Sequence, residues 1–297
     1  MTTNQNIVPH LWYDKEAKEA AEFYASIFPD SRITSITPLD DTPSGDSHLV
    51  SFELWGQKFL SINAGPIFKF NPSVSFMVNF DPKSDKEAIE KINMVWSKLS
   101  EGGTVLTPLD KYSFSDKYGW IQDKYGLSWQ LILKNTEDEE RPTIMPSLMF
   151  GGDQYNKAEE ALQYYLSVFN NAKKGSIARS DKEGAVMFSD FMLENQWLTA
   201  MDSAENYEFR FSEAISLTVY CDTQEEIDHY WNKLSAVPES EQCGWLKDKY
   251  GMNWQIVPRE KETMMTSGTP EQVARVTQAT LKMKKLDLAE LQEAYKG

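Results

Sequence analysis

The sequence predicts an α+β protein built from two similar halves, each made of two βαβββ modules. The most direct observation is a repeated string: GWIQDKYGLSWQLI begins at Gly119 and returns as GWLKDKYGMNWQIV at Gly244. The second is that other segments recur in the same order, with QKFLSIN in one half matching QWLTAMD in the other. The third is that each half alternates strand-like and helix-like apolar patterns in one fixed order.

The repeat divides the chain into three parts. Residues 1–136 form the first copy, residues 142–262 the second copy, and residues 269–297 a helical tail. The acidic segment NTEDEERP between the copies is interpreted as a solvated linker.

The first module of copy one begins with the apolar strand IVPHLWY, which leads into a helix. Three strand patterns follow, in RITSIT, HLVSFEL and KFLSIN. The apolar residues of the helix keep a spacing that places them on one face: Ala20, Phe23, Tyr24, Ile27 and Phe28.

The second module of copy one repeats this order. It has the strand SVSFMVNF, a helix, and strands through TVLTPL, YGWIQD and SWQLIL. The helix carries one apolar face: Ile92, Val95, Trp96 and Leu99. We therefore expect eight main strands and two principal helices in each copy.

Two capping boxes mark the expected starts of the second helix in each copy. Ser84 with Glu87 has the required spacing in copy one, and Thr223 with Glu226 has it in copy two.

The tail predicts two further helices. Thr269, Pro270 and Gln272 suit the N-cap, N1 and N3 positions of a helix that reaches about residue 285, and Asp287 with Glu290 begins a second. An apolar stripe should pack these helices on the two copies: Val273, Val276, Met283, Leu286, Leu288 and Leu291.

Composition limits the class of protein. Acidic residues outnumber basic ones by 45 to 30, which excludes nucleic acid as a partner because binding it requires clustered Lys and Arg. No apolar run approaches the roughly 18 residues that span a bilayer, and the first residues lack a signal-peptide pattern. We expect no membrane partner and a cytoplasmic location. The two cysteines, Cys221 and Cys243, provide neither a disulfide framework nor zinc-site spacing.

The strings LWYDKEAKEAAEFYASIFPDSRI, GQKFLSINAGP, NPSVSFMV and GWLKDKYGMNWQIVP resemble the PhnB-like branch of the vicinal oxygen chelate superfamily. That superfamily also contains glyoxalase I, bleomycin-resistance proteins and extradiol dioxygenases. The resemblance implies a glyoxalase-like fold, in which paired βαβββ modules curl into an open half-barrel around a cavity.

Members of this branch carry the label 3-demethylubiquinone-9 3-methyltransferase, but the sequence offers no glycine-rich loop after a strand to hold an adenosyl cofactor. The glycines of EGGTV, from Glu101, follow a helix and are interpreted as its C-cap turn.

The resemblance also implies where a metal would bind, since glyoxalase I and the dioxygenases place His and Glu ligands on the first and last strand of each module. The equivalent places in copy one are Pro9 or His10, Ser61, Ser73 and Gln130, and those in copy two are Pro146 or Ser147, Ala200, Ala214 and Gln255. These side chains cannot balance the charge of a divalent cation. We expect no bound metal and no cofactor, with His10 and Gln130 as the one pair of plausible ligands.

Side-chain alternation places Trp129 and Leu131 on one face of the last strand, and Gln130 and Ile132 on the other. If the ligand position of the relatives is a guide, Gln130 faces the cavity. It then needs a hydrogen-bond partner, because an unpaired buried amide costs roughly 1–3 kcal/mol. The repeated Trp and Gln suit a packing role as well as a binding role.

The turn of the repeated string is predicted to be solvated. Asp123 and Lys124 are interpreted as turn formers with exposed charges, beside a Gly126 that can adopt positive φ.

We expect one cavity in copy one and a degenerate counterpart in copy two. His10 and Gln130 are the candidate catalytic residues. The expected borders of the first cavity are His10, Asn63, Phe76, Trp120 and Gln130, and those of the second are Asp202, Trp245 and Gln255.

Three classes of function remain open on this sequence. The first is binding of a small planar or carbonyl-containing molecule without a tightly bound metal. The second is an enzyme, either a metal-dependent lyase, isomerase or dioxygenase or a metal-free one with His10 and Asp202 as proton-transfer candidates. The third is a protein-interaction scaffold. The two copies should pair as an internal pseudo-dimer, which makes a further homodimer unnecessary.

Overall fold

The computed structural model describes residues 5–135, 139–180, 184–203 and 209–297. It confirms an α+β fold with two open sheets, and neither sheet closes into a barrel. The described part of the chain contains no helix that is long and apolar enough to cross a bilayer.

The first copy contains eight strands and two helices, as the sequence predicts. They are β1 (Ile7–Tyr13), α1 (Ala17–Ile27), β2 (Arg32–Thr42), β3 (Gly45–Leu54), β4 (Gln57–Asn63), β5 (Val74–Phe80), α2 (Ala88–Ser100), β6 (Thr104–Tyr112), β7 (Ser115–Gln122) and β8 (Ser128–Leu133).

Within its described residues, the second copy follows the same order with one strand fewer, and three helices form the tail. Its elements are β9 (Ile144–Phe150), η1 (Gly152–Gln154), α3 (Ala158–Val168), β10 (Ala172–Arg179), β11 (Val186–Leu193), β12 (Gln196–Asp202), β13 (Ile215–Cys221), α4 (Gln224–Leu234), η2 (Pro238–Ser240), β14 (Trp245–Lys247) and β15 (Asn253–Pro258). The tail consists of α5 (Arg259–Ser267), α6 (Pro270–Lys282) and α7 (Leu288–Lys296).

The missing strand has a simple cause. Eighteen residues lie between Ser100 and Gly119, but eight lie between Ser235 and Gly244, so copy two lacks the length for the hairpin that β6 and β7 make. In the described part of copy two, the short helix η2 takes the place of the expected strand.

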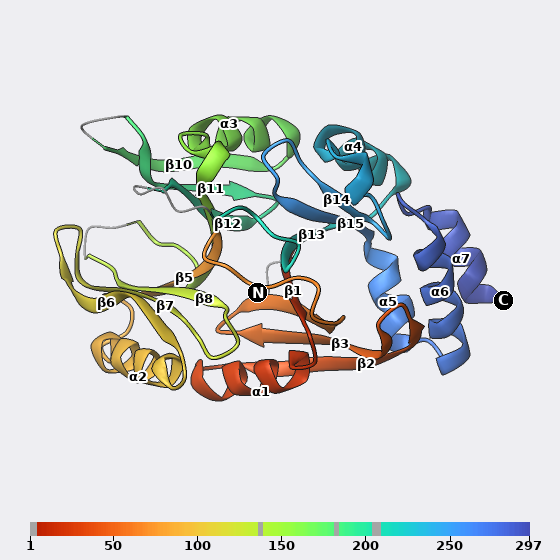
Figure 1. The fold of residues 1–297 in the computed structure, drawn as a ribbon, viewed down its shortest axis with the longest axis horizontal. Helices are drawn as coiled ribbons and strands as arrows, with labels where there is room; N and C mark the ends of the chain where they lie inside the picture. Colours follow the sequence, from red (N-terminus) through yellow and green to blue (C-terminus); the bar gives the residue numbers. More distant parts are fainter. Residues whose placement is uncertain (1–4, 136–138, 181–183, 204–208) are drawn as a thin grey trace.

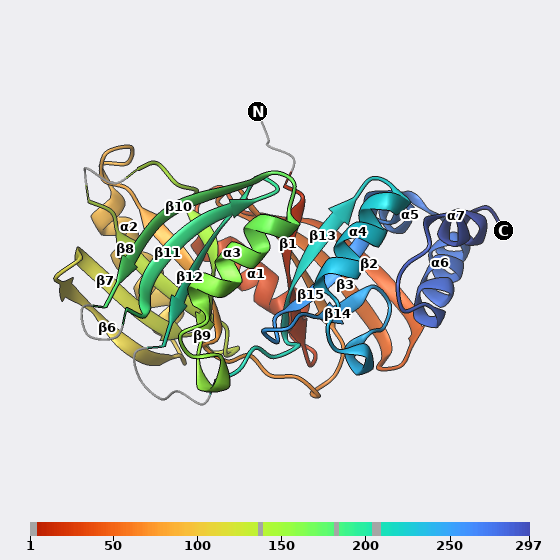
Figure 2. The same cartoon turned by 90° about the horizontal axis from the view of Figure 1, so that it is seen from above.

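Each sheet contains strands of both copies. The first sheet has the order β14-β15-β13-β1-β4-β3-β2, and the second has the order β10-β11-β12-β9-β5-β8-β7-β6. The copies meet where β1 pairs antiparallel with β13, and where β5 pairs antiparallel with β9. The two sheets lie next to each other along the long axis of the molecule, with α5, α6 and α7 at the end beyond the first sheet (Figures 1 and 2).

Alternation along the strands divides each sheet into a core face and an opposite face. On β8, Trp129 and Leu131 are buried in the main core, while Gln130 lies on the other face, as predicted. The helices α1 and α2 cover the core face of copy one, and α3 and α4 cover that of copy two (Figure 1).

The repeated string is explained by a buried carboxylate in each copy. In copy one, Asp123 Oδ2 accepts hydrogen bonds from the Tyr24 hydroxyl at 2.7 Å and the Trp129 indole at 2.9 Å. Its Oδ1 accepts from the backbone N–H groups of Tyr125 and Leu127. Three of these donors hold the turn and β8 together, and the Tyr24 hydroxyl joins them to the helix α1 of the other module.

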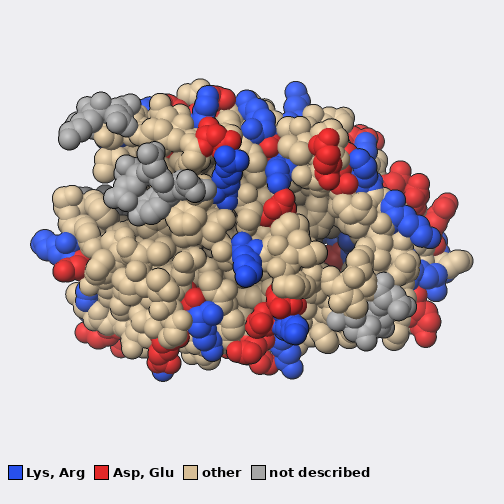
Figure 3. Space-filling model, viewed as in Figure 1, with Lys and Arg blue, Asp and Glu red and all other residues tan. Residues whose placement is uncertain are grey.

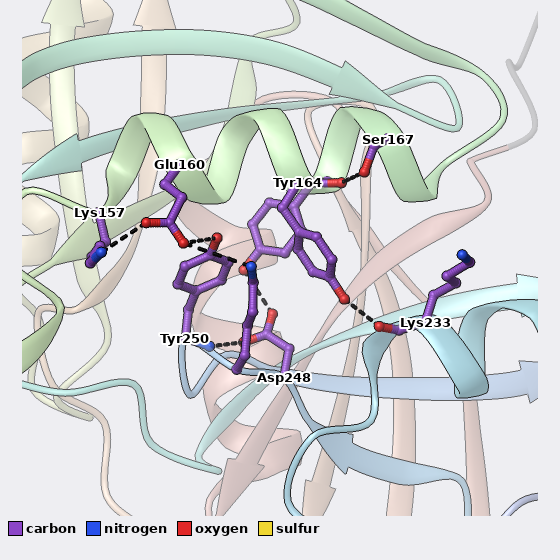
Figure 4. Close-up of polar contacts among 9 residues, drawn as sticks. Lys157, Glu160, Tyr164, Ser167, Lys233, Asp248 and Tyr250 are labelled. Atoms are coloured by element: carbon purple, nitrogen blue, oxygen red, sulfur yellow. Dashed lines mark hydrogen bonds and ion pairs between the residues drawn. The ribbon is translucent and has the colours of Figure 1, made fainter.

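Copy two repeats this arrangement around Asp248. The carboxylate accepts hydrogen bonds from the Tyr165 hydroxyl at 2.7 Å, the Trp254 indole at 2.8 Å and two backbone N–H groups of the turn. Figure 4 shows the turn beneath α3, where the Tyr250 hydroxyl donates to Glu160 at 2.9 Å.

The prediction of a solvated Asp123 is therefore wrong, because only 4% of this residue is exposed. Burial raises its pKa, and the four hydrogen bonds act in the opposite direction. Lys124 is exposed, as predicted, and its ammonium lies over the rings of Phe23 and Tyr125, at 4.6 and 4.9 Å from their centroids. Gly126 does adopt the predicted positive φ, at 85°.

The predicted helix caps agree with the structure at three of four places. Thr223 accepts from the backbone of Glu226, Thr269 and Gln272 form a complete capping box, and Asp287 caps α7. The predicted box at Ser84 does not form, because α2 begins four residues later with Glu87 at its N-cap.

The tail packs on the two copies, as its apolar stripe predicts. Val276, Leu286 and Leu291 are fully buried in a second core that includes residues of β1, β13 and β15. The backbone N–H groups of Cys243 and Gly244 donate to carbonyls that follow α6, which fixes the tail beside β14. The helix α5 was not predicted as a separate element.

Replacing Asp123 by Ala should lower the free energy of unfolding by about 3–5 kcal/mol, because four donors lose their buried acceptor. Urea denaturation measures the change. The control is Asp116→Ala, which removes an exposed ion pair with Lys111 and should leave the free energy of unfolding almost unchanged. Equal effects of the two substitutions would contradict the structural role of the buried carboxylate.

Deleting every residue after Gly268 should lower the melting temperature by about 10 °C or more, since it removes three fully buried apolar side chains. Differential scanning calorimetry provides the measurement. An unchanged melting temperature would mean that the tail does not contribute to the core.

Candidate functional site

A cavity of about 680 Å³ lies between the first sheet and the tail helices. Its walls come from β1 and β4 of copy one, β13 and β15 of copy two, and the helices α5 and α6. Figure 3 shows a hollow near the place where Figure 1 draws α5, with acidic and basic side chains in its depth. The cavity is thus a joint product of both copies and the tail.

The same strand alternation that builds the core supplies the cavity floor. On β1, Leu11 enters the core while His10 and Trp12 line the cavity, and on β15 the core residue Trp254 is followed by Gln255, which lines it.

His10 is the titratable group at the centre of the floor. The Gln255 side-chain N–H donates to His10 Nδ1, and it also donates to Ser216 Oγ at 2.9 Å. Because Nδ1 accepts, the neutral ring carries its proton on Nε2. That Nε2 atom is buried and has no hydrogen-bond partner among the described residues.

The pKa of His10 is lowered from 6.5 to about 4, chiefly by burial and to a smaller extent by the charge of Lys261, while the hydrogen bond with Gln255 acts in the opposite direction. The ring is therefore neutral at pH 7. In this state His10 offers an N–H donor to a guest, and it does not supply an acidic proton.

Aromatic rings form one wall. The ring centroids of Trp245 and His10 are 5.5 Å apart, and those of Trp245 and Trp12 are 6.2 Å apart in an edge-on arrangement. Phe68 packs against Trp12 at 5.1 Å. Such a wall suits a flat apolar guest.

The tail provides side chains that the sequence analysis did not associate with a site. Lys261 and Met265 come from α5, and Thr277 and Thr280 from α6. The sequence contained one signal for this part of the site. Thr277 and Thr280 are three residues apart, so they share the face of α6 that packs inward, where polar side chains are unexpected.

Four buried polar atoms of the cavity wall have no hydrogen-bond partner among the described residues: His10 Nε2 and the hydroxyls of Thr218, Thr277 and Thr280. Buried polar groups in native proteins are usually paired. In this cavity these atoms are available for hydrogen bonds to a bound molecule or to ordered water.

Four of the predicted site residues line this cavity, and the others lie elsewhere in the fold. His10, Asn63, Trp245 and Gln255 line the same cavity although they were assigned to two. The grouping by copy is wrong because each sheet combines a module of one copy with a module of the other.

Gln130 and Trp120 lie on the second sheet, away from His10. The Gln130 amide has the partner that its burial requires. It accepts from Tyr118 at 2.8 Å and donates to Ser75 at 2.8 Å and Ser147 at 3.3 Å.

Phe76 and Asp202 are not part of the wall of this cavity. Phe76 is fully buried in the core, against Phe59 and Trp129. Asp202 accepts hydrogen bonds from the N–H groups of Ala158 and Val186, which anchors the start of α3. The equivalent Asn63 accepts from Ala17 at the start of α1, so both hold a helix in place.

The donors at the floor do not fit the metal that the resemblance implies. His10 is the one imidazole there, and its Nδ1 is already engaged by Gln255. The lining carboxylate of Glu213 is paired with Lys247 at 2.6 Å. The described residues hold no cluster of three or more His, Cys, Asp or Glu side chains that could bind a metal ion.

Comparison with known families agrees with this fold. The sequence pattern of the 3-demethylubiquinone-9 3-methyltransferase family matches residues 5–132 and 142–257. The chain belongs to that family, in two tandem copies.

Solved structures with similar folds include a PhnB protein and glyoxalase I. A PhnB protein from Bacillus cereus is 37% identical over 44% of this chain and 100% of its own, with a TM-score of 0.39. Glyoxalase I from Zea mays is 11% identical and covers 86% of this chain and 95% of its own, with a TM-score of 0.55. At that identity the likeness concerns the fold alone. No curated protein sequence matches the chain at a significant level.

His10 should titrate near pH 4 and carry its proton on Nε2 at pH 7, which ¹⁵N NMR of the ring can measure. The unfolded chain, with a pKa of 6.5, binds more protons between pH 6.5 and 4. The contribution of His10 to stability is therefore full above pH 6.5 and falls as pH drops, by about 3 kcal/mol at pH 4.

The matched control is His10→Asn, which keeps an acceptor near Gln255 but does not titrate. The difference in unfolding free energy between wild type and variant should shrink or reverse below pH 6.5. A pH-independent difference would contradict the lowered pKa.

Proposed function

We propose that this cavity binds a small, largely planar, carbonyl-containing molecule, and that it does so without a tightly bound metal. The observation that carries the proposal is the combination of one aromatic wall with unpartnered polar atoms in a cavity of about 680 Å³. Cavities of roughly 300–1,000 Å³ with apolar walls and few polar groups are typical of small-molecule sites.

The metal-dependent alternative is weaker because of the donor set. One imidazole and an amide, without a free carboxylate beside them, provide too little charge for a divalent cation. Methyl transfer, which the family name suggests, is also weaker. The residues that line the cavity include no glycine, so no glycine-rich loop is available to cradle an adenosyl cofactor.

A thermal-shift screen followed by calorimetry would identify guests, with planar aromatics, quinones and α-keto thioesters as the panel. Trp245→Leu should weaken binding of a planar guest about tenfold, because it removes the stacking surface. Trp120→Leu is the control, since Trp120 holds the equivalent place on the second sheet. Equal losses of affinity in both variants would mean that the guest does not bind against Trp245.

Metal analysis after gentle purification distinguishes the alternatives. We expect far less than one equivalent of iron, manganese, nickel or zinc. Near one equivalent, lost on His10→Ala, would overturn the proposal and favour the metal-dependent enzyme.

A further inference from the structure

Lys261 is a charged side chain in the cavity wall that lacks a counter-ion. It lies on α5 and is half-buried, and within the described ranges it forms neither an ion pair nor a hydrogen bond. The half-buried carboxylate of the wall, Glu213, is already paired with Lys247. Glu239 and Glu262 also line the cavity, but both are exposed at its rim.

The unpartnered atoms of the wall share one property: each can donate a hydrogen bond. His10 Nε2 and the ammonium of Lys261 can only donate, and the hydroxyls of Thr218, Thr277 and Thr280 can do so by rotating. These three threonines and His10 are at least nine-tenths buried. A guest that satisfies them must be rich in acceptors.

Most of the remaining surface of the wall is apolar. Leu39, Leu60, Val257 and Met265 line the cavity together with the aromatic residues. An unpaired ammonium in such surroundings is costly, so the gain from supplying it with an anion is large. A neutral polar guest or a highly charged one would match this wall less well.

We propose that the guest is an organic monoanion with a flat apolar body, whose carboxylate pairs with Lys261 while the body stacks on Trp245. This inference rests on the proposed function and specifies its ligand class. The donors left over, on His10 and on the tail helix α6, serve further carbonyl or carboxylate oxygens of the same guest.

The proposal predicts a pH dependence. Desolvation lowers the pKa of Lys261 to about 8, so the free protein loses the positive charge above that pH and binding of a carboxylate weakens. The other titratable groups of the wall are His10, which is neutral at these pH values, the phenol of Tyr220, whose pKa burial raises, the thiol of Cys243, and the carboxylates of Glu213, Glu239 and Glu262.

The experiment compares acids with their neutral amides. Isothermal titration calorimetry on the full chain would use benzoate, 2-naphthoate and 9-anthroate, each beside the matching amide. Lys261→Met should cut the affinity for a bound acid about 10- to 100-fold and leave the amide within about twofold. Lys282→Met is the matched control, because Lys282 is an exposed lysine of the tail outside the cavity wall.

The outcomes separate this inference from the proposed function. If acid and amide bind wild type equally, or Lys261→Met leaves acid binding unchanged at an unaltered melting temperature, the anion inference is wrong and the cavity remains a binding site. If only the amides bind, the anion inference is also wrong. If none of the six probes binds at millimolar concentration and the wider panel also fails, both proposals fall.

Discussion

The antiparallel pairing of β1 with β13 is the contact on which the site depends. It joins a strand of the first copy to a strand of the second, and its register places His10 opposite Ser216. Because β13 also pairs with β15, Gln255 reaches the same point and donates to the imidazole. Without this pairing, the residues of the cavity floor would belong to two unconnected half-sheets, and the tail would have no continuous surface to cover.

Local features of the chain were predictable from sequence because their causes are local. Side-chain alternation along β8 predicted that Gln130 and Trp129 lie on opposite faces of the sheet. The cap at Thr269 was predicted from that residue and the three that follow it. The location of the site was not predictable in this way. Which module pairs with which is decided by contacts far apart in the chain, so the sequence assigned His10 and Gln255 to different cavities, and the structure brings them together.

The environments of two other residues were not predicted for a different reason. Each residue is found in surroundings that are unusual for its amino-acid type. An aspartate in a turn is normally solvated, yet Asp123 is buried and joins its turn to α1. A lysine on a short polar helix normally faces water, yet Lys261 faces a cavity that exists only after the tail has folded over the sheet. Neither environment can be inferred from a window of neighbouring residues.

The covalent linkage of the two copies has a consequence for how the sites can change. In a dimer of identical chains, every substitution appears at both symmetry-related positions, so both sites must tolerate it. In this chain each position exists once. The first sheet holds an imidazole on β1, whereas the equivalent place on β9 of the second sheet holds the hydroxyl of Ser147 beside Gln130. The two sheets can therefore carry different side chains at equivalent places, because a substitution in one copy leaves the other copy unchanged.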